Sequence, residues 1–282
     1  MATNDAAQAQ APRWHGTNLV GVPAEELAST AFNAQPRPLA IAGTLATHRL
    51  LFELLDECPD LNQAHAMFEN YLNLAFGLKT PAAHEVQTLS APAQRRWHSS
   101  WRRLLQGWGM DANGAAGAVL KGWVESRFGL APTFHKAPLT RFPSPAWVGY
   151  LNEKAGSRYN NHSIYQQLDL LYAYCQWALR RVHIDGGAEA QHLRLWRGTN
   201  QWEEQLMAGR LQNRHCTVRL NNVVSFSQSQ EDASCFGDWV LEVQVPLCKV
   251  IVFPELLPGQ VLTGEQEVLA LGGDYEVTAR YA

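Results

Sequence analysis

Two short stretches near the end of the chain decide its fold: Val223-Val-Ser-Phe-Ser-Gln-Ser229 and Thr263-Gly-Glu-Gln-Glu-Val-Leu-Ala-Leu271. Both are rich in β-branched, aromatic and aliphatic residues and contain no proline, which predicts β-strands. Because side chains in a strand alternate between two faces, Glu265 and Glu267 share a face. Two neighbouring carboxylates repel each other, and glutamate is a poor strand former. The pair therefore indicates a functional site.

Polar residues also alternate in the first stretch, where Ser225, Ser227 and Ser229 are expected on one face. A third segment, Leu193-Arg-Leu-Trp-Arg-Gly-Thr199, alternates in the same way and carries Arg197 near its end. An arginine followed by a glycine offers a fixed cation beside an approachable backbone N–H. This combination suits a pyrophosphate.

Taken in chain order, Arg197, Ser225-Phe-Ser227 and Glu265-Gln-Glu267 resemble the R-S-E signature of mono-ADP-ribosyltransferases. The Glu-x-Glu form resembles the branch that modifies arginine. A lone Glu-x-Glu is more often the solvated face of an edge strand, and an isolated arginine or serine is an ordinary surface residue. The order and the strand context of the three motifs favour the functional interpretation.

The composition predicts a folded protein that does not bind nucleic acid. The 282 residues are enough for one large domain or two small ones, and a 46% apolar share with ten tryptophans can build a packed core. The net charge is −3 and no long basic run is present, which argues against nucleic acid as a partner. No apolar stretch approaches the roughly 18 residues of a membrane span.

Several other classes of site and location are disfavoured by missing motifs. The first twelve residues lack the basic and apolar regions of a signal peptide. The five cysteines are dispersed and form no Cys-x-x-Cys pair, which is typical of reduced thiols, so we expect a cytoplasmic protein. His-Glu-x-x-His and Gly-x-Ser-x-Gly are both absent. The sequence predicts no metal requirement.

The hydrophobic period changes near Glu189, which predicts an α+β protein with its helices before its strands. Helical spacing is expected at 50–58, 67–76, 97–108, 119–128 and 163–182. Alternation with period two is expected at 192–197, 217–228, 238–245, 248–253, 261–271 and 274–281. We expect a tail and extended lead-in at 1–37, a helical part at 38–188, and a β-rich, split-sheet NAD-binding core at 189–282.

Three local features complete these expectations. Residues 111–117 are expected to form a glycine-bearing loop, which lacks the Lys-Ser/Thr pair of a P-loop. The prolines between 132 and 145 predict an irregular crossing. Ser163, followed three residues later by Gln166, predicts the capping box of the clearest helix.

Five longer segments are similar to one family, the NAD+–dinitrogen-reductase ADP-D-ribosyltransferases. They are Gln106-Gly-Trp-Gly-Met-Asp-Ala-Asn-Gly114, Gly117-Ala-Val-Leu-Lys-Gly-Trp-Val-Glu-Ser-Arg-Phe-Gly-Leu130, Gln167-Leu-Asp-Leu-Leu-Tyr172, Val218-Arg-Leu-Asn-Asn-Val-Val-Ser-Phe-Ser227 and the run 257–273 with its Gly264-Glu-Gln-Glu-Val-Leu-Ala-Leu-Gly-Gly273. The resemblance extends from about Pro36 to Tyr275. It implies transfer of ADP-ribose from NAD+ to an arginine of the nitrogenase iron protein, which reversibly switches off nitrogen fixation. It also implies regulation by a PII signalling protein and removal of the group by a separate hydrolase.

The resemblance assigns the chemistry to three residues. Glu267 matches the last glutamate of the motif and would stabilise the oxocarbenium-like ribose through its 2″-hydroxyl. Glu265 would orient the acceptor guanidinium and help to remove its proton. Ser225 would hydrogen-bond Glu267 and fix its rotamer. No metal is required, because the leaving group of NAD+ already carries a positive charge.

The remaining assignments concern NAD+ itself. Arg197 would hold the pyrophosphate or the adjoining ribose, the Gly198 backbone would approach the nicotinamide amide, and Phe236 would pack on the nicotinamide side. Ser-Phe-Ser replaces the commoner Ser-Thr-Ser of the family, so Phe226 is either a stacking or a packing residue. The full NAD+-binding set is Arg197, Gly198, Thr199, Ser225, Phe226, Ser227, Phe236 and Glu267.

Two other functions fit the same residues. An NAD-hydrolysing, toxin-like enzyme would use the same site without a protein acceptor. A non-catalytic module would bind NAD or a protein and never turn over. Nicotinamide release and protein labelling distinguish the three functions.

Overall fold

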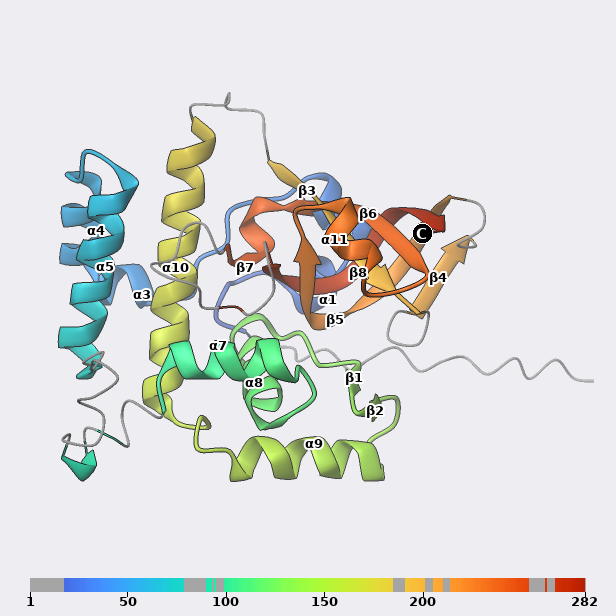
Figure 1. Cartoon of the computed structure of the whole chain (residues 1–282), viewed down its shortest axis with the longest axis horizontal. Coiled ribbons are helices and arrows are strands. Elements are labelled where there is room, and N and C mark those ends of the chain that lie inside the picture. Colours follow the sequence, from blue (N-terminus) through green and yellow to red (C-terminus); the bar gives the residue numbers. More distant parts are fainter. Residues whose placement is uncertain are drawn as a thin grey trace, which may run out of the picture.

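The computed structural model describes residues 18–78, 90–92, 94, 99–184, 191–200, 205–209, 214–253, 262 and 267–281. Figure 1 shows the long helices on one side of the molecule and the large sheet on the other, with short helices beside the sheet; the long helices come earlier in the chain. All pairings within the six-stranded sheet are antiparallel. The predicted α+β class is confirmed.

The helices and strands in chain order are as follows. The helices are α1 (Ala24–Leu27), α2 (Thr30–Ala34), α3 (Thr44–Thr47), α4 (Arg49–Asp56), α5 (Leu61–Phe76), α7 (Trp101–Met110), α8 (Ala115–Phe128), α9 (Pro145–Gly156), α10 (His162–Ile184) and α11 (Gln230–Ser234). The strands are β1 (Phe134–His135), β2 (Ala137–Pro138), β3 (His192–Thr199), β4 (Gln205–Gly209), β5 (His215–Ser227), β6 (Trp239–Pro246), β7 (Val250–Val252) and β8 (Glu267–Tyr281).

The sheet has the order β4-β5-β3-β6-β8-β7, with an additional pairing of β5 with β8. β8 pairs with three strands: its residues 267–278 lie against β5, Leu269 and Ala270 lie against β7, and residues 277–281 lie against β6. The expected runs 261–271 and 274–281 are one strand over 267–281, and residues 263–266 lie outside the described residues.

A bulge in β5 explains why β8 continues through two glycines. The register between β5 and β8 shifts between Leu220 and Val223. There the backbone approaches so closely that a Cβ on Gly272 would lie 1.6 Å from the Asn221 carbonyl oxygen. The bulge also directs the Asn222 amide to the carbonyl oxygens of Lys121 and Leu130, at 2.9 and 2.8 Å. It therefore fastens α8 to the sheet.

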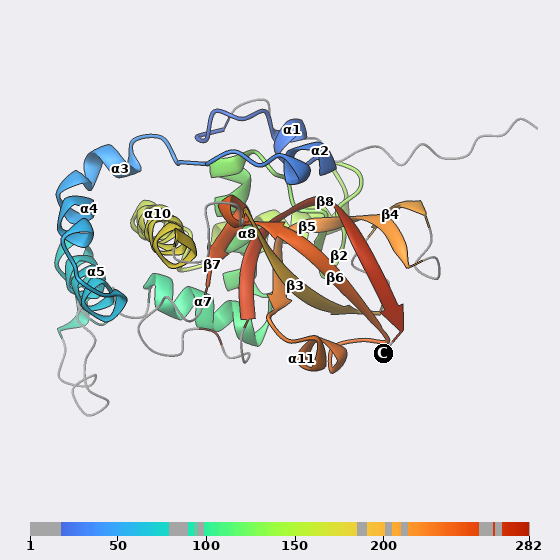
Figure 2. The same cartoon turned by 90° about the horizontal axis from the view of Figure 1, so that it is seen from above.

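Helix α10 is the central helix, with α4 and α5 on one side and the sheet on the other (Figure 2). Its apolar side chains Leu168, Leu171, Tyr172, Cys175 and Leu179 recur at helical spacing and are buried. The side chains of Tyr172 and Gln176 donate hydrogen bonds to the backbone of residues 247–250. The helix thereby covers the β7 edge of the sheet.

The start of α10 differs from the sequence expectation. Asn161 Oδ1 accepts a hydrogen bond from the Ile164 backbone N–H at 3.0 Å, whereas Ser163 Oγ accepts from the Gln167 side chain. The capping box predicted at Ser163 and Gln166 is therefore wrong. The asparagine lies just before the first turn and reaches its free N–H groups first.

Helix α9 was not expected, because the prolines before it predicted only an irregular crossing. The Ser144 side chain caps this helix by accepting from the Trp147 N–H, and Pro145 begins it. Proline is favoured at this first position, where no N–H is needed. The loop expected at 111–117 is also shorter, because α8 begins at Ala115.

Short elements account for the other differences. The two short helices α1 and α2 lie in the lead-in, where we expected an extended chain with at most one short helix. α3, α11 and β4 carry too few residues for a recognisable period. One cluster of buried apolar side chains includes Leu27 of α1, Leu171 of α10 and Leu269 of β8. None of the helices in the described part of the chain combines the length and apolar character needed to span a membrane.

Candidate active site

Strands β5 and β8 bring Ser225 and Glu267 into contact. Ser227 lies opposite Glu267 in the register, which places Ser225 diagonally across from it on the same face. Ser225 Oγ donates to Glu267 Oε1 at 2.6 Å. This is the hydrogen bond that the sequence led us to expect, and the strand pairing is its cause.

Arg197 reaches the same place from β3. Its neighbour Trp196 lies opposite Ser227 in the antiparallel register. Arg197 Nη1 donates to the Ser225 backbone oxygen at 3.0 Å. The arginine, serine and final glutamate of the expected signature therefore meet on three strands. Glu265 lies outside the described residues.

A tryptophan from the helical layer completes this cluster. Trp108, near the end of α7, is 4% exposed. Its Nε1–H donates to Ser225 Oγ at 3.1 Å and to Glu267 Oε1 at 3.3 Å. In the sequence, Trp108 ends the run 97–108 of helical spacing, which indicates a core position. A buried indole N–H needs an acceptor, but the sequence does not show which one.

Ser225 and Ser227 face one side of β5, and Phe226 faces the other. Phe226 is 2% exposed and packs edge-to-face on Tyr275 with ring centroids 6.3 Å apart. This contact favours the packing role over the stacking role. Ser227 Oγ accepts from the Ser229 N–H at 3.0 Å. Ser229 has left the strand to cap α11, so the expected shared face of three serines holds for two.

Close packing explains why position 198, after Arg197, is a glycine. A Cβ on Gly198 would lie 2.0 Å from the Ala233 carbonyl oxygen and 3.1 Å from Cβ of Phe236. Thr199, the next residue, is buried, whereas the Phe236 side chain is 70% exposed. The α11 segment therefore packs directly on the β3 backbone and presents Phe236 to solvent beside it.

A cavity of about 100 Å³ lies between the helical layer and this cluster. Among its lining residues are Trp108, Lys121, Arg197, Asn221 and Ser225. Two of these side chains are cationic, which gives the cavity a positive electrostatic character. Lys121 is 1% exposed and donates to Asn113 Oδ1 and to the Phe134 carbonyl oxygen, both at 3.0 Å.

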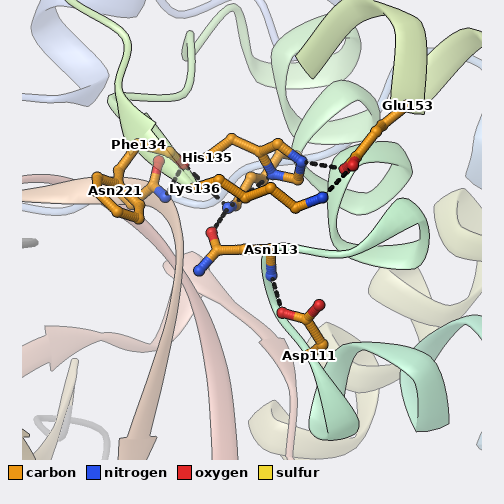
Figure 3. Close-up of polar contacts among 8 residues, drawn as sticks. Asp111, Asn113, Phe134, His135, Lys136, Glu153 and Asn221 are labelled. Carbon is orange, nitrogen blue, oxygen red and sulfur yellow. Dashed lines mark hydrogen bonds and ion pairs between the residues drawn. The ribbon is translucent and has the colours of Figure 1, made fainter. Parts of the chain in front are cut away.

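Figure 3 shows Asn113, from the loop before α8, close to Phe134 and His135 of β1, with Glu153 of α9 beside His135. His135 Nδ1 lies 3.4 Å from Lys121 Nζ, and its Nε2 lies 2.7 Å from Glu153 Oε2. Burial lowers the pKa of His135, although Glu153 opposes the shift. The described residues contain no group of three or more His, Cys, Asp or Glu side chains that could hold a metal ion.

Comparison with known proteins identifies the family. A family model described as dinitrogenase reductase ADP-ribosyltransferase (DRAT) matches residues 17–279. The chain belongs to this family.

A relative from Rhodospirillum rubrum, named NAD(+)–dinitrogen-reductase ADP-D-ribosyltransferase, is similar to this DRAT-family chain over nearly its whole length. The two are 49% identical over 267 residues, which cover 95% of each chain. No solved structure matches the chain significantly. The family resemblance drawn from the sequence is confirmed, and the roles of individual residues stay predictions.

Proposed function

We propose that this protein transfers ADP-ribose from NAD+ to an arginine of dinitrogenase reductase, and so switches off nitrogen fixation reversibly. The family match and the name of the relative support the donor and the acceptor protein. The observation that carries the site is the 2.6 Å hydrogen bond from Ser225 to Glu267, beside Arg197. The choice of arginine within the acceptor rests on the Glu-x-Glu form of the last motif.

Glu267 is the catalytic carboxylate in this proposal. The bond between nicotinamide and C1″ of the ribose breaks, its electron pair leaves with nicotinamide, and C1″ becomes oxocarbenium-like. Oε1 of Glu267 accepts from Ser225 and Trp108, so Oε2 is the oxygen that we assign to the ribose 2″-hydroxyl. A carboxylate held there stabilises the developing positive charge.

The acceptor poses a second chemical problem, because a guanidinium has no lone pair to offer until it loses a proton. We assign Glu265 to this step. It orients the guanidinium, accepts its proton as the nitrogen attacks C1″, and later returns that proton to water. No atom of the reaction requires a metal.

The NAD+ contacts are assigned around the same cluster. Arg197 holds the pyrophosphate or the adjoining ribose, and the Gly198 and Thr199 backbone lies toward nicotinamide with Phe236 on its outer side. Ser227 supports the ribose side, and Phe226 contributes by packing beneath the strand. The close packing of Gly198 on the α11 segment supports this assignment, because it holds the arginine and Phe236 in one rigid unit.

The wider organisation follows from this site. We propose residues 189–282 as the NAD-binding catalytic core, 38–188 as its helical cover and 1–37 as a tail and lead-in. A cytoplasmic location is supported by the five cysteines, all of which are free. Regulation by a PII signalling protein is carried by the resemblance alone.

The test uses the full chain, NAD+ labelled in the adenylate, and purified dinitrogenase reductase. We expect nicotinamide release together with label on one arginine of the acceptor, and neither product with Glu267→Gln. Nicotinamide release without labelled protein would support the toxin-like hydrolase. NAD+ binding without either product would support the non-catalytic module.

A further inference from the structure

We propose that Trp108 is a positioning residue for catalysis, whose indole N–H fixes both the Ser225 hydroxyl and the Glu267 carboxylate. This inference rests on the proposed function, because it concerns the same carboxylate. It goes beyond the arginine–serine–glutamate signature, because Trp108 comes from helix α7 and lies 159 positions from Glu267 in the chain.

The Trp108 N–H fixes the orientation of the Ser225 hydroxyl, which the serine alone cannot do. A hydroxyl both donates and accepts and rotates to suit its surroundings, whereas an indole N–H only donates. The Trp108 N–H lies 3.1 Å from Ser225 Oγ and so occupies an accepting position of that oxygen. The serine proton is then left to point at Glu267 Oε1, 2.6 Å away. The tryptophan thereby sets the direction of the serine hydrogen bond.

The same N–H also reaches Glu267 Oε1 directly, at 3.3 Å. Two donors from different layers of the protein then converge on one carboxylate oxygen. Such a carboxylate cannot turn without losing both bonds, so Oε2 stays where the ribose hydroxyl is expected. Hydrogen bonds to charged groups are stronger than those between neutral groups.

The position of the indole is itself fixed by tight packing of α7 on α8. A Cβ on Gly107 would lie 2.7 Å from Cβ of Ala116, so the two helices are in close contact beside Trp108. Lys121 Nζ lies 5.9 Å from the centroid of the Trp108 ring. Lys121 is in turn anchored by Asn113 Oδ1 and the Phe134 carbonyl oxygen. These contacts hold the Trp108 indole in position without any substrate.

The test is Trp108→Phe in the full chain, which keeps an aromatic ring and removes the N–H. We expect kcat for nicotinamide release to fall about 10- to 100-fold, with KM for NAD+ within about twofold. The change is confined to kcat because the carboxylate acts mainly on the charge that develops in the transition state.

Trp123→Phe is the matched control. Trp123 is buried in α8 and donates its N–H to a carboxylate, Asp169 Oδ1, at 2.7 Å, but it has no part in the site. It should lose thermal stability and keep kcat within about twofold of the unmodified protein. In a Ser225→Ala background, Trp108→Phe should cost markedly less than alone, because the two side chains act on one oxygen.

Several results would overturn the inference. These are a folded Trp108→Phe protein with kcat within threefold of normal, a loss matched by Trp123→Phe, or additive effects with Ser225→Ala. If Trp108→Phe does not fold, 3-benzothienylalanine at position 108 keeps the bicyclic shape, replaces N–H by sulfur and decides the same question. Glu267→Gln is measured in parallel. If it stays active, the proposed catalytic site is wrong; if it is inactive while the Trp108 variant is normal, only this inference fails.

Discussion

The contact of α8 with α10 and the contact of α7 with the sheet each contain a buried tryptophan that donates to a carboxylate. In the first, Asp169 accepts from Trp123 at 2.7 Å and from Arg127 at 2.8 and 2.9 Å, so both of its oxygens are engaged. In the second, Glu267 accepts from Trp108 and Ser225 on Oε1 alone. Within the described residues, no arginine or lysine forms an ion pair with Glu267.

The difference distinguishes Asp169, a structural carboxylate, from Glu267, the carboxylate that we propose as catalytic. Arg127 donates two hydrogen bonds to Asp169, and the side chains of this ion pair are only 12–15% exposed. The charge of Asp169 is therefore neutralised within the protein. Glu267 is oriented by neutral donors, which hold its position without neutralising its charge. A carboxylate in that state can respond to a positive charge that appears on a substrate.

The largest effect is expected at Glu267. Glu267→Gln should lower kcat/KM for nicotinamide release at least about 1000-fold, roughly 4 kcal/mol, because it removes the charge and keeps the shape. The thermal unfolding midpoint should stay within about 2 °C, since Gln can still accept from Trp108 and Ser225. Retention of more than about a tenth of the activity would contradict the assignment.

A second carboxylate refines the comparison, because Glu265 is assigned to the acceptor alone. Glu265→Gln should lower arginine modification at least about 100-fold and leave slow hydrolysis of NAD+ by water. The measurement is a pair of rates on one variant: nicotinamide released and ADP-ribose attached to protein. Equal loss of both would show that the two glutamates act as a unit.

Asp169→Asn tests the structural side of the comparison. It leaves the partly buried Arg127 without its counter-charge, so the free energy of unfolding should fall by about 2–3 kcal/mol in urea titrations. The kcat of the folded protein should stay within about twofold, because Asp169 lies outside the site. A variant that keeps its stability and loses activity would reverse the roles given to the two carboxylates.

The smallest effect is expected at a third buried charge, Lys249, which is fully buried over the rings of Phe32 and Tyr275. Its ammonium makes no hydrogen bond to the described residues, and burial lowers its pKa from 10.5 to about 7. Lys249→Met should raise the free energy of unfolding by about 1 kcal/mol at pH 6, net of the lost ring contacts.

The sign of the pH dependence follows from the lowered pKa. Between about pH 7 and 10.5 the unfolded lysine binds a proton that the folded one has released. The destabilisation by Lys249 is therefore complete below pH 7 and disappears as the pH rises toward 10.5. Urea titrations of both proteins at pH 6 and pH 9 should show the advantage of Lys249→Met lost or reversed at pH 9. A constant or growing advantage would contradict this account.

Much of the sheet could be predicted from the sequence, because a strand's period of two is a local property. The spans of β3, β5 and β6 were close to those expected, and the face shared by Ser225 and Ser227 followed from the alternation. The pairing that brings Glu267 diagonal to Ser225 depends on register, which alternation alone does not determine; the family resemblance implied only the hydrogen bond between the two side chains.

Contacts between layers could not be predicted in this way. Trp108 looked like any other core residue of an amphipathic helix, since nothing local indicates which strand an indole N–H will face. The Asn222 amide, which joins the β5 bulge to α8, depends on a bulge that alternation does not reveal. The helix after Ser144 was hidden by its prolines, although serine followed by proline is itself a helix start.

The late position of β8 in the chain has a consequence for the synthesis and folding of the protein. Ribosomes deliver the arginine and serine strands first, and Glu267 follows as the first residue of the described final strand. That strand must join β5, β6 and β7 before the carboxylate meets Ser225 and Trp108. Contacts of such long sequence separation form late in folding. With Glu267 as the proposed catalytic carboxylate, we expect a chain without β8 to release no nicotinamide from NAD+.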